Sequence, residues 1–347
     1  MTGLVPPPFE RLSLLGLPWP TDWTAVFGQP ARPLVLEIGF GRGDFLVHLA
    51  ARHPEAFVVG IEVSNRSLAA AERKLLRGEA PNARVVHASA EAALARLFAP
   101  SSLVAIHANF PDPWFKARHQ GRRLFRPAVL DAMVSRLAPG GALCLATDIL
   151  AYAEMAADLF ARTPGLDNAL PAPWADALPD RVVTKYEARA RAEGRPCHYF
   201  VLRRNARPAP AVPVEEDRPM PHIVFEGAAD LAALQAAFRR GELGSGATHV
   251  GLIAAYRADD ALLIEAFVEE PSIGQRVALI MRRQGADRYV LGLGALGRPR
   301  ATPGVHEAVA LVARWLLERA GGLRVAEGGL VIDQPARRTF DGAEAPV

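Results

Sequence analysis

The strongest constraint on the fold is an apolar run that ends in a glycine-rich turn and continues as a helix. The run is PLVLEI (33–38), the turn is GFGRG, and the FLVHLAARH that follows has helical spacing and stops before Pro54. Further strands are predicted over 56–62, 83–88, 103–110 and 142–147, and a helix over 68–77. Strands that alternate with helices predict an α/β fold with a doubly wound, parallel sheet. Ligands bind such sheets outside the carboxyl ends of the strands, so we expect the functional residues there.

A second region begins after a proline-rich stretch. Residues 205–221 contain five prolines and no apolar period, which is typical of a stiff, extended linker. Beyond it, five strand-like runs and two helical patterns (231–240 and 305–319) predict a smaller α+β domain with a mostly antiparallel sheet and helices on one face. The predicted division is therefore a first domain over 1–205, a linker over 206–221 and a second domain over 222–347.

Composition excludes several classes of protein. No run approaches the roughly 20 consecutive apolar residues that a membrane span needs, and the first ten residues do not look like a signal peptide. Cys144 and Cys197 form no CxxC pair or Cys/His cluster. We expect a cytoplasmic protein without a membrane segment, a metal site or redox chemistry.

The glycine-rich turn indicates a ligand-binding loop. Gly39, Gly41 and Gly43 allow a tight turn and a close approach of the backbone to a ligand. A dinucleotide-binding fingerprint has its third glycine one place later, where Asp44 stands, and that carboxylate would repel a phosphate. S-adenosylmethionine has no phosphate and carries a positive sulfonium and an amino group, so it suits an acidic loop better.

Two further acids support this interpretation. Glu37 ends the first strand beside the turn, and Glu62 closes the second strand, where it can accept hydrogen bonds from ribose hydroxyls. The alternative is that the glycines mark only a tight turn and that Glu62 is an exposed strand end. The two acids and the five-strand pattern together make this alternative weaker.

A second candidate loop follows the fourth strand. In the run NFPDPWFK (109–116), two prolines hold Asp112 and Trp114 at the crevice. Net charge is only +3, but five cations and no acid lie in the short stretch that follows. Such a run is either a solvated loop or a contact for nucleic acid phosphates, and its place beside the crevice favours the second. These cations are Lys116, Arg118, Arg122, Arg123 and Arg126.

The motifs resemble a known family. The first strands and loops resemble the class I S-adenosylmethionine methyltransferases, which have a Rossmann-like fold. FPDPW, then KARH and RRL, look like the hallmark of the bacterial tRNA (guanine-N7) methyltransferases, and this family also shows ATD and TKFE, found here as ATD (146–148) and TKYE (184–187). The resemblance covers about residues 30–205.

The resemblance implies roles for individual residues. Glu37, Glu62 and Asp112 become contacts of S-adenosyl-L-methionine, with Asp112 in the catalytic centre, and tRNA becomes the partner. Arg118, Arg122 and Arg123 of the basic run are the candidate phosphate contacts. Substrate contacts would be Lys116, Asp148, Thr184, Lys185, Tyr186 and Glu187.

This chain departs from the family at three positions. Ser89 stands where an acid usually lies near the adenine, and a hydroxyl can make one hydrogen bond there. Tyr186 replaces a phenylalanine and keeps an aromatic face for stacking. Asn109 stands where a second phenylalanine is common, and the sequence gives no consequence for this change.

The expected reaction is transfer of a methyl group to N7 of a guanine, which the resemblance places in the tRNA variable loop. N7 already has a lone pair, so catalysis would be mainly positioning, with Asp112 and Asp148 orienting the base. For Asp148 the alternative is a cap on the helix predicted after it. For Glu187 the alternative is a weak pair with Arg189 or Arg191 on an exposed turn.

Other functions stay open at this point. A methyltransferase for a small molecule or a protein leaves the basic run unexplained, a non-catalytic tRNA-binding scaffold leaves the acids unexplained, and a nicotinamide oxidoreductase conflicts with the glycine spacing. A methyltransferase for another RNA is a further alternative. Residues 222–347 show no chemical motif, and an accessory tRNA-contacting or oligomerising role is the working hypothesis. The protein would be a monomer or a homodimer.

Overall fold

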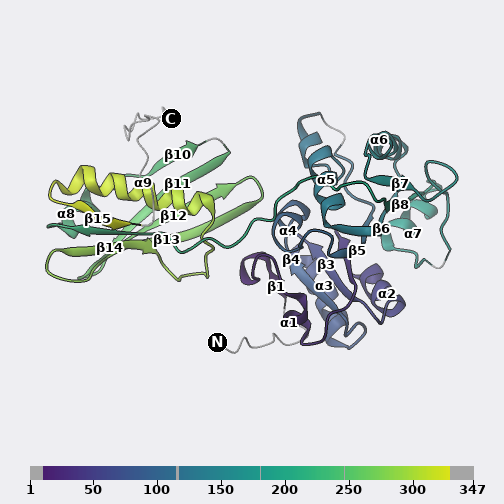
Figure 1. The fold of residues 1–347 in the computed structure, drawn as a ribbon, viewed down its shortest axis with the longest axis horizontal. Helices are drawn as coiled ribbons and strands as arrows, with labels where there is room; N and C mark the ends of the chain where they lie inside the picture. Colours follow the sequence, from purple (N-terminus) through teal and green to yellow (C-terminus); the bar gives the residue numbers. More distant parts are fainter. Residues whose placement is uncertain (1–10, 115–116, 180, 246, 329–347) are drawn as a thin grey trace. The chain divides into compact units, whose positions relative to one another are not determined.

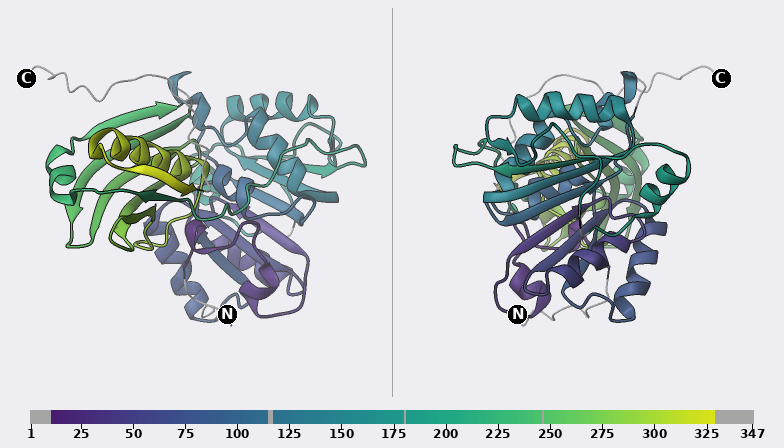
Figure 2. Two further views of the ribbon diagram at one scale, coloured as in Figure 1. Left: turned by 60° about the vertical axis from the view of Figure 1, so that its left-hand side comes forward. Right: turned by 90° about the vertical axis from the view of Figure 1, so that its right-hand side faces the viewer.

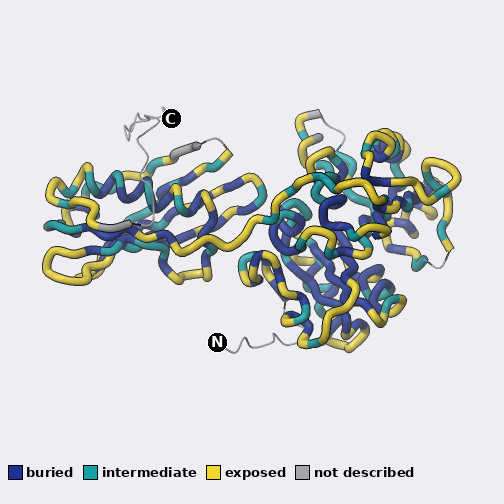
Figure 3. The backbone as a smooth tube through the Cα atoms, viewed as in Figure 1, coloured by how far each residue is buried: buried dark blue, intermediate teal, exposed yellow. Residues whose placement is uncertain are grey.

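The chain forms two compact units, residues 1–216 and 217–347. The computed structural model describes residues 11–114, 117–179, 181–245 and 247–328 (Figure 1). In the first unit the central strands and the inner sides of the helices are buried, whereas strands of the second unit alternate between buried and more exposed positions (Figure 3).

The first unit is built on an eight-stranded sheet in the order β1-β4-β3-β2-β5-β6-β8-β7. Pairing is parallel from β1 through β6, so the doubly wound α/β prediction is confirmed. The structure adds an antiparallel edge, because β8 pairs antiparallel with β6 and β7 with β8. The strands are β1 (Leu12–Ser13), β2 (Leu34–Ile38), β3 (Phe57–Glu62), β4 (Ala83–His87), β5 (Leu103–Asn109), β6 (Leu137–Thr147), β7 (Leu166–Asn168) and β8 (His198–Arg204).

Helices connect these strands and cover the sheet (Figure 2). The apolar sides of α2 and α3 form one core cluster with β2, β3 and β4, in which Phe45 and Leu49 of α2 and Leu68 of α3 meet Val58 and Val85. This packing follows from the helical spacing of the apolar residues after the glycine turn. The helices are α1 (Trp23–Phe27), α2 (Asp44–Arg52), α3 (Asn65–Leu76), α4 (Ala90–Arg96), α5 (Pro127–Arg136), α6 (Leu150–Ala161) and α7 (Lys185–Ala192), with short 3-10 helices at η1 (Leu14–Gly16) and η2 (Ala117–Arg122).

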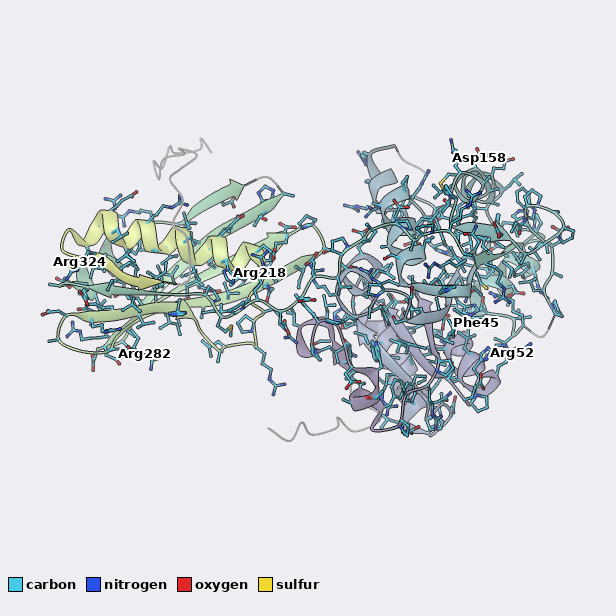
Figure 4. All side chains as sticks on the ribbon, in the orientation of Figure 1. Phe45, Arg52, Asp158, Arg218, Arg282 and Arg324 are labelled. Carbon is cyan, nitrogen blue, oxygen red and sulfur yellow. The ribbon has the colours of Figure 1, made fainter. Side chains whose placement is uncertain are left out.

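The second unit is a seven-stranded antiparallel sheet in the order β10-β11-β12-β13-β14-β9-β15, which confirms the predicted α+β arrangement. Leu231 and Leu234 of α8 and Val309 and Trp315 of α9 belong to one core cluster with inward residues of the sheet such as Leu279. Arg282 and Arg324 lie at the surface of this unit (Figure 4). Its elements are β9 (His222–Glu226), α8 (Leu231–Ala237), β10 (Gly241–Ser245), β11 (Thr248–Arg257), β12 (Ala261–Glu270), β13 (Ile273–Arg283), β14 (Arg288–Leu293), α9 (Pro303–Ala320) and β15 (Arg324–Gly328).

The stretch predicted as a linker has no helix or strand over 205–221, and its first half is bound to the first unit. The guanidinium of Arg136, which is fully buried, donates to the carbonyls of Val212 and Pro213, each at 2.9 Å. Glu215 donates its backbone N–H to the Ala95 carbonyl and pairs with Arg96 at 2.7 Å. The predicted limits 1–205, 206–221 and 222–347 stay a prediction, and these contacts place residues 212–215 in the first unit.

Candidate active site

The glycine turn lies at the point where the strand order of the first sheet reverses, between β2 and β5. This is where doubly wound sheets bind their ligands. Gly39, Gly41 and Gly43 have φ values of +69°, +56° and +77°, a region that L side chains rarely adopt. A Cβ on Gly43 would also lie 2.9 Å from the Cβ of Ala71 in α3. The turn therefore requires glycine for its backbone conformation and, at Gly43, for its packing.

Glu37 is the central buried acid of the site. It lies in β2 between Gly60 of β3 and His107 of β5, and only 1% of its surface is exposed. Its Oε1 accepts a hydrogen bond from Nδ2 of Asn109 at 3.3 Å, whereas its Oε2 has no hydrogen-bond partner. Burial raises the pKa of this carboxyl to about 8, against an opposing effect of Asn109 and of the Arg181 charge.

A cavity of about 420 Å³ opens beside Glu37 and the glycine turn. This volume lies in the range of small-molecule sites, roughly 300–1,000 Å³. The cavity brings together predicted cofactor residues (Glu37, Gly39, Gly41) and predicted substrate residues (Thr184, Lys185, Tyr186) that are far apart in sequence. The predicted residues that do not line it are Gly43, Glu62, Ser89, Asp112, Asp148 and Glu187. Its lining also includes Arg42, Asp44, Phe45, Ser64, Arg66, Arg73 and Asn109.

Glu62 ends β3 and contacts the glycine turn, and Ser89 follows the carboxyl end of β4. Oε2 of Glu62 accepts from the N–H of Gly41 at 3.0 Å, and its Oε1 accepts from the N–H groups of Val63 and Ser64. Glu62 thus stabilises the glycine turn through a direct hydrogen bond. Ser89 is the N-cap of α4, where its Oγ accepts from the N–H of Ala92 at 3.2 Å and keeps its own hydrogen for another partner.

The loop after β5 presents Asp112 at the surface. The backbone is held in the left-handed region at Phe110 (φ +53°) and Trp114 (φ +41°), on either side of this aspartate. Such conformations are uncommon for bulky residues and are frequent at functional sites. Asp112 is exposed, so a ligand can reach its carboxylate.

The described cations of the basic run differ in their surroundings. Arg123 donates to the carbonyls of Pro113 and Trp114, at 3.0 and 3.4 Å, and thereby closes the loop. The guanidinium of Arg122 stacks over the Trp114 ring at 5.3 Å, and Arg118 is exposed. Lys116 lies outside the described residues. Of the three predicted phosphate contacts, Arg118 and Arg122 are exposed and Arg123 is half-buried in the loop that it closes.

Asp148 follows β6 and forms an ion pair with Arg195. The alternative role as a helix cap is wrong, because the N-cap of α6 is Ile149 and no side chain makes a capping hydrogen bond there. The side chain of Asp148 is 15% exposed, so the arginine orients a carboxylate that solvent or a ligand can still reach.

The segment Thr184–Glu187 begins α7 at the cavity. Thr184 is the N-cap and accepts from the N–H of Glu187 at 3.2 Å, while Lys185 and Tyr186 are exposed. Glu187 is only 1% exposed and pairs with Arg191 at 2.6 Å. The alternative prediction for Glu187 was a weak ion pair on an exposed turn. The partner Arg191 is confirmed, but the exposure is wrong, because Glu187 is buried. The role of Glu187 as a substrate contact stays a prediction, and its burial would hold this carboxylate away from a ligand in this conformation.

The sequence interpretation missed Arg181 and gave no role to Asn109. Arg181 stacks on the rings of Phe45 and Tyr199, with its guanidinium carbon 4.5 and 5.2 Å from the ring centroids, and lies 3.8 Å from Glu187 (Figure 4 labels Phe45). It also donates to Oδ1 of Asn109. The only sequence signal was a polar residue, Asn109, at the end of a largely apolar strand.

Two buried groups beside the site, His107 and Cys144, have shifted pKa values. Burial lowers the pKa of His107 to about 3, so this imidazole is uncharged, and burial raises the pKa of the Cys144 thiol to about 11.

Among the described residues, no group of three or more histidines, cysteines or acids could hold a metal ion. No helix in the described part of the chain is long and apolar enough to cross a membrane.

The fold and the crevice define the class of protein. Residues 31–200 match the model of a family described as "Putative methyltransferase". This range contains the glycine turn, the loop after β5 and the segment Thr184–Glu187. The first unit is thus a methyltransferase domain with a Rossmann-like sheet.

Relatives define the family. The chain is 42% identical over 185 residues to the tRNA (guanine-N(7)-)-methyltransferase of Cutibacterium acnes, which covers 53% of this chain and 67% of that protein. It is 36% identical over 313 residues to the tRNA (guanine-N(7)-)-methyltransferase of Thermus thermophilus, which covers 89% of this chain and 96% of that protein. Among solved structures, the 16S rRNA methyltransferase KamB aligns with a TM-score of 0.39 and 18% identity, over 50% of this chain and 88% of that one. The chain belongs to the tRNA (guanine-N(7)-)-methyltransferase family.

The two relatives differ in how far the match extends. The match to the Cutibacterium acnes protein covers about half of this chain, whereas the match to the Thermus thermophilus protein spans 313 residues and must reach well into the second unit. The match to the Thermus thermophilus protein therefore includes at least part of the second unit.

Proposed function

We propose that the protein transfers a methyl group from S-adenosyl-L-methionine to N7 of a guanine in the variable loop of tRNA. The observation that carries this proposal is the cavity beside Glu37, in which a buried carboxylate oxygen without a partner meets a glycine turn and residues of the Thr184–Glu187 segment. The names of the relatives give tRNA as the substrate and N7 of guanine as the modified atom. The basic run beside Trp114 supports an RNA substrate.

The residues present fit this methyl donor. Oε2 of Glu37 is buried and lacks a hydrogen bond, so an ammonium group would both satisfy it and favour its charged form. Glu62 closes β3 and retains acceptor capacity for ribose hydroxyls, and the hydroxyl of Ser89 can donate to the adenine. The backbone of Gly39 and Gly41 would line the same ligand. When bound, the donor supplies an electrophilic methyl group on a positive sulfonium.

The guanine would be positioned rather than activated. N7 of guanine is an acceptor with a free lone pair, so no general base has to remove a proton before the methyl transfer. The exposed carboxylate of Asp112 and the carboxylate of Asp148, which Arg195 orients, would accept hydrogen bonds from the N–H groups of the base. Both acids would also offset the positive charge that the ring gains. Lys116 and Tyr186 are proposed to contact the same nucleotide.

The tRNA would be held beside the acceptor loop by the exposed arginines of the basic run. Arg118 is exposed, and Arg122 is exposed while it stacks on Trp114, so both guanidinium groups can approach phosphates. Each phosphate contact releases counterions, so binding should weaken by about 0.7 to 0.9 log units per contact for each tenfold rise in salt.

The test is a methylation assay that reports the modified atom. The purified full chain is incubated with unmodified tRNA and methyl-labelled S-adenosylmethionine, and the product is treated with borohydride and aniline, which cleave the chain at N7-methylguanosine. We expect label in the tRNA and one cut in the variable loop. Label without a cut would refute the N7 assignment, a cut elsewhere would refute the variable loop, and absence of label would refute the activity in favour of a tRNA-binding scaffold.

Two variants test whether Asp112 takes part in the reaction. Asp112→Asn should greatly reduce the methylation rate, because it removes a charge from the proposed catalytic centre. Asp176→Asn, at an exposed aspartate outside the cavity lining, is the matched control and should leave the rate unchanged. Equal rates for Asp112→Asn and the control would exclude Asp112 from the reaction.

A further inference from the structure

Asn109 lines the cavity and bridges two ionisable side chains, Glu37, which also lines the cavity, and Arg181. Its Nδ2 donates to Oε1 of Glu37 at 3.3 Å, and its Oδ1 accepts from Nη2 of Arg181. An amide is suited to this place, because it offers a donor to the carboxylate and an acceptor to the guanidinium at the same time. The orientation of the amide is thereby fixed by its two partners.

The bridge determines which atom of Glu37 is free for a ligand. Because Oε1 is occupied by Asn109, the oxygen without a partner is Oε2. Arg181 is itself held by the rings of Phe45 and Tyr199, so the bridge is anchored on both sides. Arg181 also lies three residues before Thr184, which begins the segment that lines the other side of the cavity.

We propose that Asn109 is a positioning residue for the methyl donor: it orients the Glu37 carboxylate towards the donor's amino group and ties it to Arg181 at the start of the substrate segment. This inference rests on the proposed use of S-adenosylmethionine. The residue acts through Glu37 and does not itself take part in the reaction.

An apolar residue at position 109 would remove both hydrogen bonds of the bridge. A leucine of similar size would leave Oε1 of Glu37 and the Arg181 guanidinium without their bridging partner in a buried place, and the carboxylate would be free to rotate or to pair directly with Arg181. Either movement takes Oε2 away from the ligand. The loss should therefore concern the part of the donor that carries the amino group and leave its adenosine part unaffected.

The test compares two ligands by isothermal titration calorimetry on the full chain. S-adenosylhomocysteine carries the amino acid part of the donor, and 5′-methylthioadenosine lacks it. We expect Asn109→Leu to weaken binding of S-adenosylhomocysteine by about tenfold or more, the loss of a hydrogen bond to a charged group. Binding of 5′-methylthioadenosine should change by less than about twofold, since no lost contact faces it. The matched control is Asn168→Leu, at an exposed asparagine of β7, which should leave both affinities unchanged.

A second variant keeps the test valid if the leucine protein does not fold. Asn109→Asp has the same shape and retains an acceptor for Arg181, but it removes the donor to Glu37 and should also weaken S-adenosylhomocysteine selectively. Unchanged affinity for S-adenosylhomocysteine in a folded variant, or equal weakening of both ligands, would overturn the role of Asn109. Failure of the unaltered protein to bind S-adenosylhomocysteine at all would instead refute the proposed methyl donor.

Discussion

The protonation of Glu37 should control how cofactor affinity depends on pH. Burial raises the pKa of this carboxyl to about 8, whereas only its ionised form can pair with an ammonium group. The charges that face it are Arg181, which lowers the pKa, and Glu62 and Asp44, which raise it. His107, its neighbour in β5, stays neutral because burial lowers its pKa to about 3.

The magnitude follows from the ionised fraction. At pH 8 about half of the free protein carries an ionised Glu37, and at pH 6 about one hundredth does, by the definition of a pKa near 8. The ligand's amino group is about half protonated at pH 8 and almost fully protonated at pH 6, since α-amino groups titrate at about pH 8, and this offsets about twofold of the effect. Affinity for S-adenosylhomocysteine should therefore be about 25-fold weaker at pH 6 than at pH 8.

Calorimetric titration of S-adenosylhomocysteine at pH 6, 7 and 8 measures this effect directly. Two controls isolate the group: 5′-methylthioadenosine, which lacks the amino group, and the variant Glu37→Gln, whose amide does not titrate. Both should show a flat profile over this range, and Glu37→Gln should bind S-adenosylhomocysteine more weakly than the unaltered protein at pH 8. A pH-independent affinity of the unaltered protein, or the same slope in either control, would refute the role of Glu37.

Three further predictions concern packing and RNA binding. Gly60→Ala should destabilise the protein by about 1–3 kcal/mol in urea unfolding, because the new Cβ would lie 2.6 Å from Cδ1 of Phe40, and an unchanged midpoint would contradict this packing. Arg136→Met should cost about 2 kcal/mol or more, since it leaves the Leu94 carbonyl and those of residues 212 and 213 without their donor. It should also speed proteolysis within 206–216, and resistance equal to that of the unaltered protein would show that this segment does not depend on the arginine. Arg122→Ala should reduce the salt dependence of tRNA binding by about one contact, or 0.7 to 0.9 in slope, and an unchanged slope would remove this arginine from the interface.

The sequence by itself determined the elements whose signal is local. The five apolar runs became β2 to β6 because a buried parallel strand needs a short continuous apolar stretch, and the turn after β2 needs glycine at positive φ. Proline and aspartate in the loop after β5 likewise marked a candidate site from neighbouring residues alone. The antiparallel strands β7 and β8 were not predicted, and the edge strand β7 has only three residues and gains its order by pairing with β8.

Only the tertiary structure decided how the polar residues of the site are paired. Asn109 lies 72 residues from both Glu37 and Arg181, and no periodicity relates positions so far apart. The pairing of Asp148 with Arg195 and the burial of Glu187 beside Arg181 and Arg191 likewise depend on where β6 and α7 pack. Residue types indicate which chemistry is possible, but hydrogen bonds and burial between distant segments arise only when the sheet is assembled.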